Sequence, residues 1–193
     1  ELIASYCLTE PGAGSDAASL KTRAVRDGDD YVLNGSKRFI SNAPVAGLFT
    51  VMARTDLDDK SAAGVSAFLV PADTPGIHID PPLEKMGQLA APTADVTFTD
   101  CRVPSHALLG ANEGQGFITA MKVLDDARIH MGAVSVGLAT RLVEEMTAYA
   151  VERRQFGQPI ADFQLIQAMI ADSEVECIAA RAMVEQTARQ MDA

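Results

Sequence analysis

The sequence has 193 residues, of which 48% are hydrophobic and 22% are charged. A chain of this length and composition can bury a substantial core, which excludes a disordered tail and a disulfide-stapled miniprotein. Asp and Glu number 26 against 16 Lys and Arg, which gives a formal net charge of -10. Because this charge repels phosphate backbones and anionic lipid surfaces, we expect no nucleic-acid partner.

The three cysteines are far apart and odd in number, which is typical of reduced thiols in a cytosol-like compartment. The three histidines share no spacing that would hold a metal ion, so no metal site is expected. No apolar run approaches the ~20 residues of a membrane span, and no signal peptide is recognisable. Because the sequence also starts without Met, we expect it to be an internal portion of a longer protein.

Residues 1–105 are predicted to form a β domain, because short apolar stretches alternate with Gly, Pro and Asp. Asp27-Gly28 lies between two strand-like runs and predicts a hairpin, since Gly accepts a positive φ. Asn34-Gly35 predicts a second turn. The further candidate strands have the spacing of an antiparallel β-barrel or sandwich, and they cover residues 38–41, 49–54, 65–70, 77–80 and 94–98.

Residues 106–193 are predicted to be mainly helical. From Phe117 to Tyr149 the apolar residues recur close to every 3.6 positions, which predicts one long amphipathic helix. Residues 155–159 break this helix, and a second helix follows from Asp162 almost to the last residue. Two long helices are an incomplete bundle, because each exposes apolar surface that its neighbour covers only in part. The predicted fold class is α+β, a β domain followed by part of an α-helical bundle.

The most unusual string is YCLTEPGAGSD, from Tyr6 to Asp16. Its G-x-G-x-x-A core, which ends one residue later, matches the short dinucleotide-binding fingerprint. That fingerprint needs a helix that opens at the glycines, whereas a β-hairpin is predicted here, and Asp16 would repel a pyrophosphate. A nicotinamide-binding Rossmann domain is therefore disfavoured. A surface turn without a ligand remains the alternative for Gly14-Ser15 taken alone.

The whole string resembles the signature of the acyl-CoA dehydrogenase family, in which a strand and turn form a flavin and acyl-CoA cradle. Residues 34–41, NGSKRFIS, are similar to the family's second flavin segment, and residues 151–160, VERRQFGQPI, to its third. The resemblance implies that residues 1–105 are the family's central β domain. It also implies that residues 106–193 are the first part of its C-terminal helical domain, with the N-terminal helical domain and the last helices absent.

The resemblance implies an FAD-dependent enzyme. In the family the first segment lines the flavin ring, the second supplies an apolar wall and a hydroxyl near flavin N5, and the third reaches the adenosine half of FAD across a subunit interface. Phe and Ser stand where the second segment usually has Trp and Thr, and they keep the wall and the hydroxyl. The implied cofactor-binding residues are Tyr6, Leu8, Thr9, Gly14, Ser15, Phe39, Ile40, Ser41, Arg153, Gln155, Phe156 and Gln164.

Several of these residues also have a structural interpretation that does not need the resemblance. Phe39 alone would be a core residue, Ser41 a turn residue and Arg153 a solvated charge at a helix end. The resemblance implies that Ser15, Asp125 and Arg128 bind the substrate, because the matching positions face acyl-CoA. A structural ion pair between Asp125 and Arg128, three positions apart on the helix, is the alternative. Arg128 falls among apolar residues, so we expect a buried, paired guanidinium.

The implied reaction removes a proton from the acyl α-carbon and a hydride from the β-carbon, which leaves a 2-enoyl-CoA. It needs a carboxylate base whose pKa is raised by the apolar acyl tunnel. Most family members carry this Glu near the C-terminus, so we expect it beyond residue 193. A minority place it just before the helix Arg, where this sequence has Ala127. No catalytic residue is therefore assigned here, and the 193 residues alone are expected to be inactive.

The short and branched-chain members, such as the isobutyryl-CoA dehydrogenases, are the subgroup that the motifs resemble most. The implied partners are an acyl-CoA substrate, an electron-transferring flavoprotein as acceptor, and further copies of the chain in a homotetramer built as a dimer of dimers. The implied compartment is the bacterial cytoplasm or the mitochondrial matrix. Two alternatives remain open: an oxidase of the same fold that passes electrons to oxygen, and a non-enzymatic segment that keeps the fold without flavin.

Overall fold

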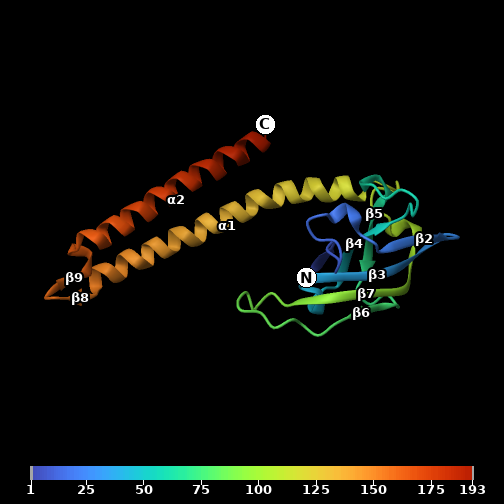
Figure 1. Ribbon diagram of the computed structural model, residues 1–193, viewed down its shortest axis with the longest axis horizontal. Helices are drawn as coiled ribbons and strands as arrows, with labels where there is room; N and C mark the ends of the chain where they lie inside the picture. Colours follow the sequence, from blue (N-terminus) through green and yellow to red (C-terminus); the bar gives the residue numbers. More distant parts are fainter. Residues whose placement is uncertain (1, 193) are drawn as a thin grey trace. The chain divides into compact units, whose positions relative to one another are not determined.

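The computed structural model describes residues 2–192, which divide into two compact units, one ending at Met121 and one beginning at Lys122. Each unit is described by itself. The first is a single seven-stranded sheet with the order β1-β4-β2-β3-β7-β6, in which β5 also pairs with β4 (Figure 1). Its strands are β1 (Ala4–Cys7), β2 (Arg23–Asp27), β3 (Asp30–Ser41), β4 (Leu48–Arg54), β5 (Val65–Pro71), β6 (Ile77–Ile79) and β7 (Thr93–Pro104).

The sheet is mixed, so the expectation of a purely antiparallel sheet was wrong in this detail. β1 pairs with β4 in parallel, and β2 meets β4 in parallel at Arg23 and Arg54. The other neighbours are antiparallel. The physical reason is the connection: residues 8–47, which include the β2–β3 hairpin, separate β1 from β4 and are long enough for the crossover that a parallel pair requires.

The hairpin predicted at Asp27-Gly28 is confirmed, but the second turn predicted at Asn34-Gly35 is wrong. Asp27 pairs with Asp30, and Gly28 has a φ of +64°. Asn34 and Gly35 instead lie inside β3, where the register with β7 shifts between Leu33 and Gly35. A Cβ on Gly35 would lie 2.6 Å from the Thr22 Cα, so this glycine permits a close approach of two backbones rather than a turn.

The core of the first unit is formed by the inward-facing residues of these strands. Phe49, Phe68 and Leu33 are fully buried, and the Tyr31 ring meets the Phe68 ring edge-on at 5.0 Å between centroids. Burial of each such side chain stabilises the fold by about 1.5–3 kcal/mol. This core fixes β3, which carries one of the candidate segments described below, and β4, which pairs with β1. Four short 3-10 helices complete the unit: η1 (Ala17–Ser19), η2 (Ala43–Val45), η3 (Ala62–Gly64) and η4 (Ser105–Ala107).

Two long helices were predicted and are confirmed. Helix α1 (Gly116–Glu152) begins in the first unit and continues into the second, where α2 (Gln164–Met191) follows it (Figure 1). Between them lie β8 (Arg154–Gln155), β9 (Gln158–Pro159) and η5 (Ile160–Asp162). Arg181 on α2 donates to the Thr140 hydroxyl on α1 at 3.1 Å, so the two helices lie side by side. Within residues 2–192, no helix has both the length and the apolar character that crossing a membrane requires.

Candidate cofactor and substrate site

The first candidate segment is β1 and the loop that follows it. Tyr6 is half-buried, and its hydroxyl has no hydrogen-bond partner among the described residues. Burial raises the pKa of Tyr6 to about 12, so this hydroxyl stays protonated and is a hydrogen-bond donor without an acceptor among the described residues. Leu8 is only 8% exposed, so it offers little surface to a ligand, whereas Thr9 is partly exposed.

The second candidate segment is a bulge in β3. The register with β7 shifts between Lys37 and Ile40, and Phe39 at the bulge has a φ of +59°. This left-handed conformation costs a residue with a Cβ about 1–2 kcal/mol. The bulge leaves Phe39 56% exposed and Ser41 exposed, while Ile40 points into the core. Asp95 holds the bulge, because its carboxylate accepts the Phe39 N–H at 3.0 Å.

Hydrogen bonds join these two segments into one body. The Ser5 hydroxyl donates to the Ser41 carbonyl at 2.8 Å, and the Arg38 N–H donates to the Thr9 carbonyl at 2.8 Å. The Lys37 ammonium donates to the Leu8 carbonyl at 3.2 Å. The residues that the sequence analysis assigned to the flavin ring in these two segments are therefore brought together by β1 and β3.

The turn after Thr9 is exposed at Gly12, Gly14 and Ser15. Glu10 and Ala13 exchange backbone hydrogen bonds of 3.0 and 3.2 Å, which fixes the turn, and Ala13 is buried beneath it. A Cβ on Gly12 or Gly14 would meet no atom within 4 Å, and Ser15 is exposed. Exposed N–H groups and a hydroxyl on a fixed turn are suited to binding a phosphate.

The third candidate segment belongs to the second unit. It is the β8–β9 hairpin, whose two turn residues, Phe156 and Gly157, have φ values of +52° and +82°. Positive φ at both positions is the geometry of a tight hairpin turn, and it leaves Phe156 94% exposed. The Phe163 ring meets the Phe156 ring edge-on at 6.2 Å between centroids. The other predicted residues of this segment, Arg153, Gln155 and Gln164, are all exposed.

Comparison with known proteins matches both parts of this chain to one family. The acyl-CoA dehydrogenase middle domain matches residues 5–101, and the acyl-CoA dehydrogenase C-terminal domain matches residues 114–193. The chain belongs to the acyl-CoA dehydrogenase family. Both matches agree with the resemblance that the three sequence segments carry.

Three relatives show how close this membership is. The chain is 46% identical to isobutyryl-CoA dehydrogenase of Dictyostelium discoideum, over 100% of the chain and 46% of the relative. It is also 46% identical to the NADH-dependent acryloyl-CoA reductase of Anaerotignum propionicum, over 99% of the chain and 48% of the relative. The structure of butyryl-CoA dehydrogenase from Megasphaera elsdenii has a TM-score of 0.94 at 37% identity and covers 98% of the chain and 49% of that protein. The chain thus spans about half the length of its relatives.

The two substrate-binding candidates on α1 differ in burial from the sequence expectation. Arg128 and Asp125 do form an ion pair, with 3.1 Å between Nη1 and Oδ1, as the alternative interpretation required. The expected burial is wrong, because both side chains are mostly exposed within the described residues. The periodicity placed Arg128 on the apolar face of α1, but that face itself is largely uncovered: Met131 and Leu138 are also exposed. Both charged groups are therefore accessible to a ligand.

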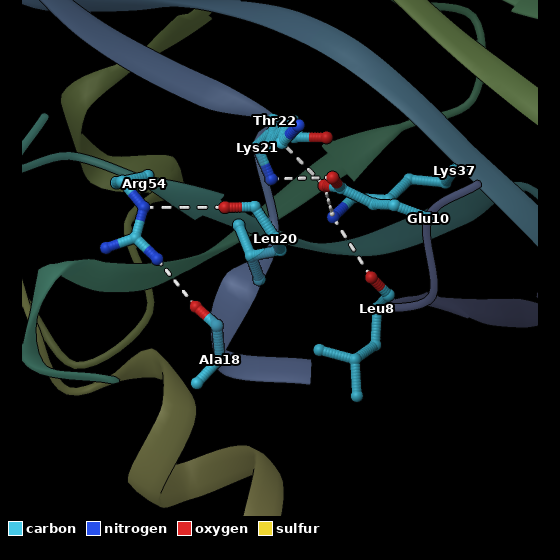
Figure 2. A network of polar contacts seen from close by, with 8 residues as sticks. All are labelled: Leu8, Glu10, Ala18, Leu20, Lys21, Thr22, Lys37 and Arg54. Carbon is cyan, nitrogen blue, oxygen red and sulfur yellow. Dashed lines mark hydrogen bonds and ion pairs between the residues drawn. The ribbon is translucent and has the colours of Figure 1, made fainter. Parts of the chain in front are cut away.

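A buried charge network that the sequence did not predict lies where the first two candidate segments meet. Lys37 is completely buried, and its Nζ lies 2.8 Å from the Glu10 Oε1 (Figure 2). Burial alone would raise the pKa of Glu10, but the Lys37 ammonium and the Lys21 and Thr22 donors outweigh it and lower the pKa below its usual value. A signal was available in the alternation of side chains along β3. Lys37 is separated from the inward-facing Tyr31 and Leu33 by an even number of positions, which predicts that it also points inward.

Proposed function

We propose that this chain is the flavin- and acyl-CoA-binding part of an FAD-dependent acyl-CoA dehydrogenase. The observation that carries the proposal is the set of hydrogen bonds that join β1 and the loop after it to the β3 bulge. It places the Tyr6 hydroxyl, Thr9, the exposed Phe39 ring and the Ser41 hydroxyl on one body. Family membership supports the same conclusion.

The residues present fit FAD. The strained, outward-facing Phe39 is a feature that a bound aromatic ring system would explain. Bound there, FAD would supply the acceptor for the hydride of the acyl β-carbon. Thr9, the Leu8 and Ile40 backbones, Phe39 and Ser41 are the residues that would hold the ring. Near the hairpin, Arg153 and Gln155 would bind phosphate and sugar oxygens, and Phe156, whose ring meets the Phe163 ring edge-on, would stack on the adenine. Gln164 at the start of α2 is a further candidate for binding the cofactor.

Candidate substrate-binding groups are proposed in each unit separately. Gly14 and Ser15 supply backbone donors and a hydroxyl to a phosphate of acyl-CoA, and Asp125 and Arg128 meet polar groups of the substrate. The carboxylate base that removes the α-proton is not assigned to a residue of this sequence. Ala127 occupies the position before Arg128 and has no group that accepts a proton.

The substrate class that we propose is a short or branched-chain acyl-CoA, supported by the 46% identity to an isobutyryl-CoA dehydrogenase. Electrons pass on to an electron-transferring flavoprotein, and the enzyme is a homotetramer of the bacterial cytoplasm or the mitochondrial matrix. The equal identity to an acryloyl-CoA reductase favours a second candidate, in which NADH reduces the flavin and a 2-enoyl-CoA takes up the hydride.

The test is the visible absorption spectrum of the protein made from the whole open reading frame. We expect a flavin band that bleaches when isobutyryl-CoA is added without oxygen. Bleaching by NADH but not by the acyl-CoA would support the reductase, and rapid return of the band with oxygen would support an oxidase. A protein that shows no flavin band even after reconstitution with FAD would refute the proposal and support a non-enzymatic role.

A further inference from the structure

We propose that Glu10 and Lys37 are positioning residues for the flavin: this buried ion pair sets the orientation of the Leu8–Thr9 backbone. The inference rests on the proposed function, since it concerns how the same site is held. Neither residue is among the cofactor or substrate candidates, and both are buried. Lys37 is completely buried and Glu10 nearly so.

The pair binds three separate parts of the chain together. The Glu10 carboxylate accepts the Lys21 N–H at 2.6 Å and the Thr22 N–H at 2.9 Å, and it accepts the Lys37 ammonium at 2.8 Å. Figure 2 shows the carboxylate between these donors. The loop from residue 10 to residue 22 contains the exposed turn at Gly14 and Ser15. The Glu10 carboxylate thus ties the two ends of this loop to each other and to β3.

The remaining bond of Lys37 reaches the flavin segment itself. β1 ends at Cys7, so Leu8 and Thr9 lie beyond the last residue that the β1–β4 ladder holds. Their carbonyls are instead fixed by consecutive residues of β3, with Lys37 Nζ on the Leu8 carbonyl at 3.2 Å and the Arg38 N–H on the Thr9 carbonyl at 2.8 Å. Because the peptide unit is planar, fixing a carbonyl also fixes the N–H of the next residue. Lys37 therefore sets where the Thr9 N–H points.

Stability alone is a poor explanation for this pair. A buried ion pair gains little over apolar residues of the same volume, because both charges must leave water. A group that acts through hydrogen bonds on the residues contacting a ligand instead changes how well that ligand is held. The geometry of Lys37, with one bond to its counter-ion and one to the Leu8 carbonyl, is that of a positioning residue.

The structure also offers a matched control in Arg54, a second buried cation. Its guanidinium donates to the Ala18 carbonyl at 2.6 Å and to the Leu20 carbonyl at 3.4 Å, in the C-terminal half of the same loop (Figure 2). It also binds the carbonyls of Asp59 and Ser61. Arg54 makes no hydrogen bond to Leu8 or Thr9 among those found in the described residues. Its loss costs buried, charged hydrogen bonds without releasing the flavin segment.

The experiment compares full-length protein carrying Lys37→Met, Lys37→Met with Glu10→Gln, or Arg54→Met. FAD affinity of the apoprotein is measured by flavin fluorescence, fold stability by the unfolding midpoint, and amide hydrogen exchange at Leu8 and Thr9 by mass spectrometry. For Lys37→Met we expect FAD binding weaker by about tenfold or more and faster exchange at Leu8 and Thr9. In Arg54→Met the midpoint falls as well, but FAD affinity stays within about twofold of the wild type.

The double variant separates position from stability. It leaves no unpaired buried charge, so its unfolding midpoint recovers relative to Lys37→Met, while FAD binding stays weak because the Leu8 carbonyl is still released. Should Lys37→Met fail to fold, the double variant carries the test. Recovery of FAD affinity together with the midpoint, or an equal loss of affinity in Arg54→Met, would overturn the inference and leave the proposed function standing. A wild type that binds no FAD would refute both.

Discussion

The strained backbone at Phe39 predicts an inverted order of stability for two simple substitutions. Phe39 is 56% exposed and has a φ of +59°, so its side chain adds little to the core while its Cβ strains the bulge. At an ordinary strand position Gly is less stable than Ala. At position 39 we expect Phe39→Gly to be more stable than Phe39→Ala.

The size of the difference follows from two opposing contributions. The left-handed conformation costs Ala about 1–2 kcal/mol and costs Gly almost nothing, whereas Gly loses roughly 0.4–1 kcal/mol more chain entropy on folding. Both variants lose the contact between the Arg38 guanidinium and the Phe39 ring, 4.9 Å from its centroid, so that loss cancels in the comparison. At the midpoints of these two ranges the Gly variant should therefore be more stable than the Ala variant by about 0.8 kcal/mol.

The assay is urea unfolding of the flavin-free full-length protein, followed by circular dichroism. The control position is Val25 on β2, which is also exposed and lies in ordinary strand geometry. There the order should be the usual one, with Val25→Gly less stable than Val25→Ala. In parallel, both Phe39 variants should bind FAD more weakly than the wild type, because the aromatic wall is gone in each.

One result would refute this reasoning. If Phe39→Ala unfolds at the same urea concentration as Phe39→Gly, or at a higher one, the bulge stores no strain at residue 39. If Phe39→Gly is more stable than Phe39→Ala but binds FAD as tightly as the wild type, the strain exists but does not serve the flavin site.

Three further predictions follow from other parts of the structure. Gly116→Ala should destabilise the fold by about 1–3 kcal/mol, because the new Cβ would lie 2.5 Å from the Ala67 backbone nitrogen; Gly87→Ala, with no atom within 4 Å, should change the thermal midpoint little. The pKa of Glu10 is lowered from its ordinary 4.5, so its contribution to stability is complete above that pH and is lost as the pH falls through the lower folded value. Acid unfolding should therefore be shallower in Glu10→Gln than in the wild type, and equal slopes would contradict the lowered pKa. Phe156→Ala removes a 94% exposed ring, so the unfolding midpoint should hold while FAD affinity falls about tenfold; an unchanged affinity in titrations of the full-length protein would remove Phe156 from the site.

The sequence by itself determined the features that depend on near neighbours. The hairpin at Gly28 follows from one turn residue between two apolar runs, and helices α1 and α2 follow from a period that repeats over many turns. The family also follows from the sequence, because its motifs are contiguous strings such as residues 6–16. Which of those residues touch a ligand stays a prediction from the resemblance.

The tertiary structure alone decided the features that join distant residues. The parallel pairing of β1 with β4, the placement of Asn34-Gly35 inside β3, and the exposure of Arg128 all depend on what the rest of the chain packs against. The pairing of Lys37 with Glu10 spans 27 positions, and no local pattern says which buried carboxylate a buried lysine will meet. The physical reason is that propensity and period act over a few residues, whereas a buried charge takes its partner from whatever the folded sheet brings within hydrogen-bond distance.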